Sequence, residues 1–234
     1  MKNNLFCLKY SGVGRELLDL KEISKKMCTN LRSYVRISTC QRVEIYSEYP
    51  MKNFNHLDSL RYPDSLIHLV ELMSGVQSGL FGEIEISKQI VSSIHNAEQN
   101  KHVSKSLLAE FKKALVISNY IREKYNLKSY WLEAISKKIK PKKMIYIFGD
   151  GELAKSLRLH LGEDRFVKEI IHADIILVLR RSSNIANHFS KKQKIINLTE
   201  EKISEDEITI EDFFKRPPKK LITQIKKDIQ SLIF

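Results

Sequence analysis

The stretch Met144-Ile145-Tyr146-Ile147-Phe148-Gly149-Asp150-Gly151-Glu152-Leu153-Ala154 decides the fold class of this chain. A short apolar run, typical of a buried strand, leads into Gly-x-Gly-x-x-Ala, and a helical pattern continues to Leu161. Glycines at these positions permit a tight turn and let a pyrophosphate approach the amino end of the helix. We therefore predict a dinucleotide site made by Gly149, Asp150, Gly151, Glu152, Leu153 and Ala154.

The residues after this fingerprint extend the α/β pattern. Apolar runs at 173–179 and 194–198 read as two further strands. The acidic residue that usually follows about 20 positions later is not evident, because Glu169 lies in a stretch, Phe166 to Ile171, that we interpret as helix. The last residues, 217–234, form a basic, amphipathic helix with Leu221, Ile222, Ile225, Ile229 and Leu232 on one side.

A different pattern precedes the fingerprint. Residues 4–10, 34–38 and 43–49 read as strands, and 15–30 as a helix between the first two, which together predict a small α+β sandwich. From Pro63 to about Lys140 the pattern is helical, and a basic stretch interrupted by Pro141 marks a boundary. The expected fold class is α/β: an α+β domain over 1–140, a small Rossmann-like nucleotide-binding domain over 141–216, and a short C-terminal helix over 217–234.

Composition narrows the class of protein. Forty Lys plus Arg against 28 Asp plus Glu give a net charge of +12, which attracts polyanions such as nucleic acid, although a lysine-rich solvated surface explains it equally well. No apolar run is long enough to cross a bilayer, and the start shows no secretory signal. Three cysteines without a CxxC pair argue against a disulfide framework or a zinc site and favour the reducing cytoplasm.

Two further segments carry candidate chemistry. In Ser38-Thr39-Cys40-Gln41-Arg42-Val43-Glu44 a guanidinium two residues from a cysteine favours its nucleophilic thiolate, whereas the alternative is a small packed residue. Three glycines between Ser74 and Glu83 interrupt a helical pattern and mark either a ligand site or an ordinary loop. For a ligand site, Ser78, Glu83 and Gln89 supply hydrogen bonds; His68, just before the glycines, is either functional or structural.

These segments occur in the order found in glutamyl-tRNA reductases. Residues 38–46 resemble that family's STCNR[TV]E[IL]Y, and residues 68–83 resemble HLxRVASGLDSxxxGE. Gln89 falls where the family has the glutamine of ILGQ, 111–122 resembles FQKAL…VR, and 149–154 resembles GAGEM[GA]. The resemblance covers nearly the whole chain.

The resemblance implies a definite mechanism and site. Cys40 would attack the ester carbon of glutamyl-tRNA to form a thioester, which NADPH would reduce to glutamate-1-semialdehyde in the first step of tetrapyrrole (porphyrin) biosynthesis. The implied partners are glutamyl-tRNA and, as a second partner, glutamate-1-semialdehyde aminomutase. The implied catalytic residues are Cys40 and His68. The implied substrate-binding residues are Thr39, Gln41, Arg42, Glu44, Ser78, Glu83, Ile84, Glu85 and Gln89.

Several departures from the family pattern keep alternatives open. Gln41 replaces the family's asparagine, Glu71 its arginine and Gln77 its aspartate. Where the family has Glu-Pro-Gln, this sequence has Glu83-Ile84-Glu85. From the spacing we expect the second and third strands of a nucleotide-binding domain and most of the family's dimerisation domain to be absent, so homodimers are not expected. A non-reducing relative that binds tRNA or a partner is the alternative. A small-molecule dehydrogenase would leave the segment from Thr39 to Glu44 unexplained.

Overall fold

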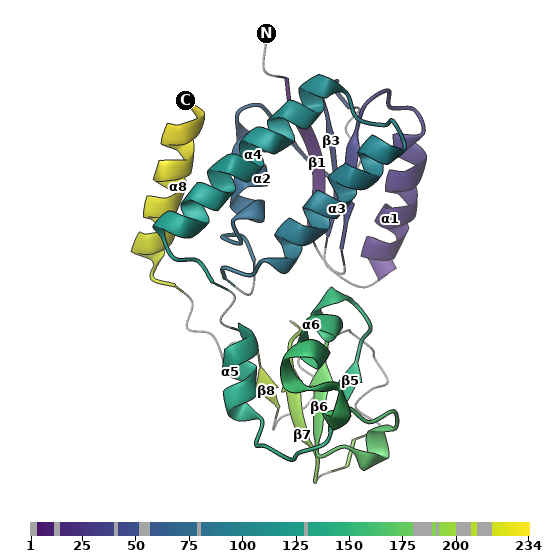
Figure 1. The fold of residues 1–234 in the computed structure, drawn as a ribbon. Helices are drawn as coiled ribbons and strands as arrows, with labels where there is room; N and C mark the ends of the chain where they lie inside the picture. The colour runs from purple at the N-terminus through teal and green to yellow at the C-terminus, as the bar shows by residue number, and fades with distance from the viewer. Residues whose placement is uncertain are drawn as a thin grey trace. The chain divides into compact units, whose positions relative to one another are not determined.

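The computed structural model (Figure 1) describes residues 4–11, 15–39, 42–51, 57–78, 81–128, 131–179, 189–190, 192–199, 207–209 and 217–234. The chain forms two compact units. The first unit contains residues 1–128 together with 217–234, and the second contains residues 129–216. Among the described residues, no helix has the length and apolar character needed to cross a membrane.

The first unit is built on a four-stranded antiparallel sheet with the order β2-β3-β1-β4. Its strands are β1 (Phe6–Ser11), β2 (Val35–Ser38), β3 (Arg42–Ser47) and β4 (Asp58–Arg61). The first three confirm the predicted strands, whereas the short, mostly polar edge strand β4 carried no apolar alternation from which to predict it. Cys7 lies opposite Tyr46 and Lys9 opposite Glu44, so these four side chains share one face of the sheet.

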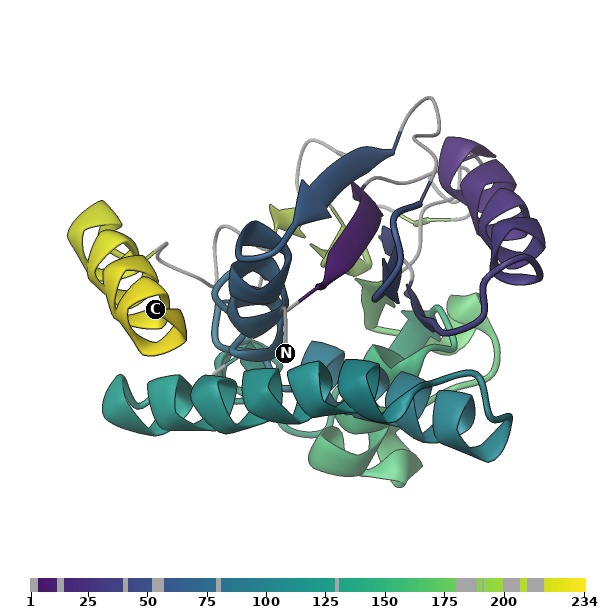
Figure 2. The same cartoon turned by 90° about the horizontal axis from the view of Figure 1, so that it is seen from above.

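Helices cover both faces of this sheet. On one face α1 (Arg15–Cys28) packs Leu20 against Val43. The other face carries α2 (Asp64–Met73), α3 (Glu85–Gln99) and α4 (Lys105–Lys124), with Phe111 of α4 meeting the Tyr46 ring edge-on at 5.3 Å. Seen from above, α4 runs along the unit beside α2 (Figure 2). This is the predicted α+β sandwich.

The C-terminal helix α8 (Lys219–Ile233) belongs to the first unit. Ile225, Ile229 and Ile233 recur every four residues and enter the core formed with α2 and α4. In addition, Asp228 accepts a hydrogen bond of 2.7 Å from Tyr125 Oη and pairs with the ammonium of Lys124. The helix is therefore an integral layer of the first unit and not a separate appendage.

The second unit is a parallel α/β arrangement. Its sheet has the order β5-β6-β7-β8, and all three strand pairs are parallel. The strands are β5 (Ile145–Phe148), β6 (Ile175–Val178), β7 (Lys194–Asn197) and β8 (Ile208–Thr209), and the helices are α5 (Trp131–Lys138) and α6 (Glu152–Leu161). The predicted strand, glycine turn and helix around Gly149 are all present, which confirms the α/β class.

The segment between α6 and β6 differs from the sequence-based interpretation. A helix from Phe166 to Ile171 is wrong, because this segment holds two short 3-10 turns, Glu163–Arg165 and Ile170–His172. Between them Phe166 pairs in parallel with Ile145, whose carbonyl accepts a 2.9 Å hydrogen bond from Val167. Val167 and Ile170 of this segment pack against the sheet residues of the second unit's core. A second strand next to β5 is thus reduced to one paired residue.

The second unit begins earlier than residue 141. Its first described helix, α5, contacts α6 and buries Ile135, and Ile139 just beyond its end is also buried. The polar stretch around Pro141 therefore connects α5 to β5 inside this unit, and the division falls at Ser129. The polar composition around Pro141 identified an exposed turn and not the domain boundary. The packing of the apolar face of α5 decides to which unit that helix belongs.

Candidate active site

The centre of the candidate site is the carboxylate of Glu44, which is completely buried on β3. Glu44 Oε1 lies 3.3 Å from Arg42 Nη1 and 3.2 Å from His68 Nε2 on α2. Its other oxygen, Oε2, accepts a 2.7 Å hydrogen bond from Tyr46 Oη. Arg42, Glu44 and Tyr46 alternate along β3, so the period of the strand brings all three to one face beneath α2.

This network fixes the charge of Glu44. Burial alone raises the pKa of this carboxyl, but the hydrogen bond and charge of His68, with the charge of Arg42 and the Tyr46 hydroxyl, outweigh it and hold the pKa below its ordinary value. A buried carboxylate satisfied in this way orients its partners. Of the predicted site residues, Arg42, Glu44 and His68 are therefore in direct contact. Tyr46 was missed, although its position two residues after Glu44 could have suggested it.

Arg42 has unused hydrogen-bonding capacity. The residue is buried, and its Nε has no hydrogen-bond partner among the described residues. Its carbonyl accepts a 2.9 Å hydrogen bond from the Thr39 amide, which ties together the residues on either side of the predicted nucleophile. Cys40 and Gln41 lie outside the described residues. The flanking residues thus present a buried guanidinium donor next to Cys40 in the sequence.

The glycine segment after α2 is closely packed. Gly75 has φ +79°, and a Cβ there would lie 2.6 Å from the carbonyl oxygen of Glu83. Gly82 has φ +80° and donates a 3.0 Å hydrogen bond to the Gly75 carbonyl. Both positions require glycine because a side chain would meet backbone atoms in a left-handed conformation. The segment is therefore a fixed structural turn that places Ser78 and Glu83.

Arg122 of α4 holds this turn in place. Its guanidinium donates four hydrogen bonds of 2.9–3.1 Å to backbone carbonyls. The acceptors are Ser74, Gly82, Glu83 and Leu127. Sequence reasoning matched Arg122 to a family motif but gave it no role. Arg122 is a basic residue in the last turn of a helix, four residues after buried Ser118. Such a position is common, so the sequence alone carries no sign of these hydrogen bonds to the backbone.

Glu83 is the second buried carboxyl of the site. Burial and the neighbouring charge of Glu85 raise its pKa to about 7, although a hydrogen bond from Ser78 and the charges of Arg42 and Arg122 oppose the rise. Glu83 can therefore exchange a proton near neutral pH. Because Arg42 acts on both Glu44 and Glu83, the two carboxyls share one electrostatic environment.

The remaining predicted substrate residues lie in the first turns of α3, with Ile84 as the N-cap of this helix. Glu85 is buried at its first turn, and its Oε2 accepts a 3.3 Å hydrogen bond from the Ile84 amide. The side chain of Ile84 is exposed, so the structure does not bring it into the cluster. Gln89 carries a buried Oε1 without a hydrogen-bond partner among the described residues. Its acceptor complements the free donor of Arg42.

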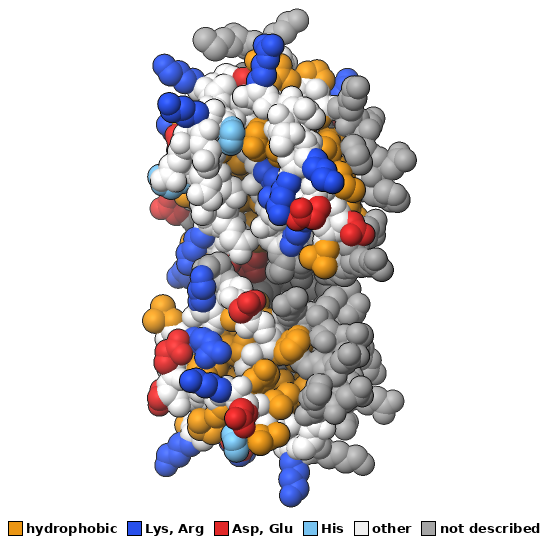
Figure 3. All heavy atoms as spheres, turned by 90° about the vertical axis from the view of Figure 1, so that its right-hand side faces the viewer, with side chains coloured by type: hydrophobic (Ala, Val, Ile, Leu, Met, Phe, Trp, Pro, Cys, Tyr) orange, Lys and Arg blue, Asp and Glu red, His pale blue; other side chains and the backbone are white. Residues whose placement is uncertain are grey.

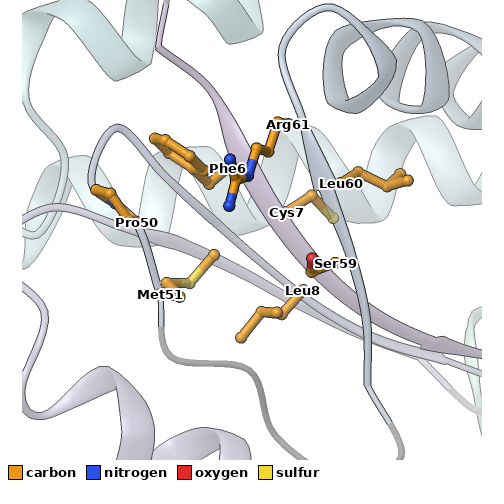
Figure 4. A pocket seen from close by; sticks show the side chains of 8 residues that line it. All are labelled: Phe6, Cys7, Leu8, Pro50, Met51, Ser59, Leu60 and Arg61. Carbon is orange, nitrogen blue, oxygen red and sulfur yellow. The ribbon is translucent and has the colours of Figure 1, made fainter.

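A hollow on the sheet is too small to bind a substrate. It has a volume of about 30 Å³ (Figure 4). Its lining is Phe6, Cys7, Leu8, Pro50, Met51, Ser59, Leu60 and Arg61. Sites for small molecules usually measure about 300–1,000 Å³. The candidate site is therefore defined by its polar network and not by this hollow.

The predicted dinucleotide residues lie at the amino end of α6 in the second unit. Gly149 has φ +135°, and Gly151 is the N-cap of the helix, where an added Cβ would meet nothing within 4 Å. Ala154 is buried, and the side chain of Glu152 lies outside the described part. The open space over Gly151 and the helix N-terminus fit a phosphate group. At the edge of β5 away from β6, Phe166 is the only described residue that pairs with β5, where a second strand would flank a nucleotide.

The basic surface shows no concentrated patch on the face drawn in Figure 3. There, Lys and Arg side chains are spread over the described surface with acidic side chains among them. On this face, the positive net charge therefore attracts a polyanion diffusely and not at one localised patch.

Comparisons with known proteins find similarity over the segments that carry the candidate site. A sequence profile described as "Glutamyl-tRNAGlu reductase, N-terminal domain" matches residues 13–125. A glutamyl-tRNA reductase from Fusobacterium nucleatum is 28% identical over 220 residues, which cover 81% of this chain and 65% of that protein. Over these segments the chain is similar to glutamyl-tRNA reductases. Another glutamyl-tRNA reductase, from Picrophilus torridus, is 30% identical over 149 residues, covering 58% of this chain and 37% of that protein.

The chain thus spans less than two thirds of the length of these curated relatives. A solved glutamyl-tRNA reductase structure from Methanopyrus kandleri aligns with 100% of this chain and 79% of that one. The TM-score is 0.55 at 17% sequence identity, so this likeness concerns the fold. It agrees with the α/β class predicted from the sequence.

Two departures from the glutamyl-tRNA reductase pattern turn out to be partners. Glu71, where the family pattern has arginine, is buried on α2 and its Oε2 accepts a hydrogen bond from the Gln77 amide, where the pattern has aspartate. Its Oε1 lies 3.5 Å from Lys226 Nζ on α8. The reversed charge is therefore compensated locally, and Lys226 links the C-terminal helix to the turn before Ser78.

Proposed function

We propose that this protein reduces the glutamyl group of glutamyl-tRNA to glutamate-1-semialdehyde, a step of tetrapyrrole biosynthesis. The similarity to glutamyl-tRNA reductases supports the substrate class, and one structural observation carries the proposal. Arg42 and Gln89 offer a buried donor and a buried acceptor that the described residues leave unmatched. A glutamyl group carries both a carboxylate and an α-ammonium, which are the complementary partners.

In this proposal Cys40 is the nucleophile. Its thiolate attacks the ester carbon of glutamyl-tRNA, a C–S bond forms, and the ester C–O bond breaks to release the tRNA 3′ end with a proton. Arg42, two residues along the chain, supplies a fixed positive charge that favours the thiolate. Glu83, with its pKa of about 7, can hold the proton that the departing oxygen needs.

His68 acts through Glu44 in this scheme. The hydrogen bond between His68 Nε2 and Glu44 Oε1 and the ion pair of Glu44 with Arg42 connect the helix α2 to the strand that follows Cys40. His68 is thus assigned a positioning role for Arg42, together with Tyr46. Its loss is expected to change the orientation of the guanidinium and to raise KM more than a remote substitution would.

We assign the binding of the cofactor to the second unit. NADPH, when bound, supplies the hydride that converts the thioester into the aldehyde. Gly149 and Gly151 would receive its pyrophosphate at the amino end of α6, as the open space over Gly151 allows. Lys168, which is exposed two residues after Phe166, would be a cation close in sequence to the shortened strand for a 2′-phosphate.

The proposal is tested with purified protein, glutamyl-tRNA and NADPH, trapping the aldehyde. Cys40→Ser is expected to abolish product, whereas Cys28→Ser, which removes a buried thiol on α1, should retain activity within about twofold. Without NADPH, mass spectrometry should find a glutamyl adduct on Cys40. Normal product formation by Cys40→Ser would overturn the assignment.

A non-reducing relative that binds tRNA is the second candidate. The observation that favours it is the single-residue pairing of Phe166, because a nucleotide-binding sheet normally has a full strand there. Saturable quenching or enhancement of NADPH fluorescence contradicts this candidate. An adduct on Cys40 without aldehyde, together with no NADPH binding, would favour it.

A further inference from the structure

Three potential metal ligands from separate elements meet inside the first unit. Cys7 on β1, Glu44 on β3 and His68 on α2 are all buried. Their ligand atoms, Sγ, a carboxylate oxygen and a ring nitrogen, lie within 4.8 Å of one another. We propose that Cys7, Glu44 and His68 form a binding site for Zn²⁺ or a similar borderline-soft divalent ion, and that the bound ion inhibits the site built around Glu44.

The geometry of two ligands already suits zinc. For Zn–N and Zn–O bonds of about 2.0–2.1 Å in a tetrahedral site, the two ligand atoms are about 3.3 Å apart. His68 Nε2 and Glu44 Oε1 are 3.2 Å apart. A Zn–S bond of about 2.3 Å places sulfur about 3.6 Å from the other ligands, so Cys7 Sγ needs a shift of at most about 1 Å, within reach of a side-chain rotation.

The surroundings also have features of a metal site. Tyr46 donates to Glu44 Oε2, which holds the carboxylate in one orientation as outer partners of metal ligands do. A thiolate, an imidazole and a carboxylate favour zinc or cobalt over magnesium or calcium, which prefer oxygen ligands.

Arg42 gives the site its regulatory character. Its guanidinium lies 3.3 Å from the same Glu44 oxygen that would bind the ion. Zinc and Arg42 therefore compete for Glu44 Oε1, and two positive charges at that distance repel each other. Ion binding is expected to release Arg42 from its position and to inhibit any chemistry that depends on it. The inhibition rests on the proposed function, whereas binding does not.

Binding is tested by cobalt titration, which needs no substrate. In the Cys28→Ser/Cys40→Ser protein, Cys7 is the one remaining cysteine of the sequence. One equivalent of Co²⁺ is expected to give a thiolate-to-metal charge-transfer band and the visible bands of a four-coordinate ion, both removed by Zn²⁺. Adding Cys7→Ser should abolish the charge-transfer band, and His68→Gln should weaken Co²⁺ affinity at least tenfold.

The outcomes separate the site from the function. No thiolate band in the folded Cys7-only protein, or a band unaffected by His68→Gln, overturns the metal site. Should the double variant fail to fold, as judged by circular dichroism, the same titration compares Cys40→Ser with Cys7→Ser/Cys40→Ser. In the unmodified protein, Zn²⁺ should inhibit aldehyde formation, and Cys7→Ala should remain active and need at least tenfold more Zn²⁺ for half inhibition. Equal inhibition of both proteins overturns the regulatory role.

Discussion

Replacing Glu83 with glutamine should change how the stability of the protein depends on pH. The pKa of Glu83 rises from an ordinary 4.5 to about 7 in the folded protein, because the carboxyl is buried and close to Glu85. Between these two values the folded state keeps a proton that the unfolded chain has lost, so stability falls as pH rises. A rise from 4.5 to about 7 corresponds to about 3 kcal/mol. That stability is present below pH 4.5 and lost above pH 7.

Urea unfolding at a series of pH values measures this effect. The free energies of unfolding of the natural protein and Glu83→Gln should be similar below pH 4.5, since both side chains are then mostly neutral in the folded and the unfolded state. Above pH 7 the variant should be more stable by about 3 kcal/mol, less any loss of the Ser78 hydrogen bond. Glu98→Gln, which removes an exposed carboxylate from α3, controls for the change in net charge.

A parallel pH dependence of the natural protein and Glu83→Gln would refute this reasoning. It would mean that Glu83 ionises normally in the folded state, and that it cannot serve as the proton carrier in the proposed reaction. A further check is Glu85→Gln, which removes the nearby negative charge and should move the loss of stability to lower pH.

Two predictions concern the turn that carries the site. Arg122→Met should lower the free energy of unfolding by about 3 kcal/mol, because four backbone carbonyls lose a charged donor. The control is Lys112→Met, on the exposed face of the same helix, which should change the free energy of unfolding by less than about 0.5 kcal/mol. Equal urea midpoints for the two variants would contradict a stabilising role for the Arg122 hydrogen bonds. Gly75→Ala should also cost about 3 kcal/mol, since its Cβ would lie 2.6 Å from the Glu83 carbonyl at a left-handed φ, and a normal urea midpoint would show that the turn can relax.

Local sequence signals identified most of the regular structure. Strand-like patterns predicted β1 to β3, with alternation as the signal for β3. The apolar run before Gly149 predicted β5, and helical spacing predicted α8, because each element must bury a continuous apolar face. The same signals failed where burial depends on a distant neighbour. Phe166 and Val167 read as part of a helix, yet they complete the open edge of β5. Leu232 was expected in the apolar face of α8, but it is 42% exposed and Ile233 is buried instead.

By itself, the sequence determined the fold class, the family resemblance and the identity of the candidate residues Arg42, Glu44, His68 and Glu83, because motifs and periodicity are local properties of the chain. The tertiary structure decided their charge states and partners. Cys7 joins Glu44 and His68, Arg122 clasps the glycine turn, and Glu71 meets Gln77 and Lys226 through side chains brought together by folding. Such contacts depend on sheet register and helix packing, which join segments far apart in the chain, so no spacing in the sequence could reveal them.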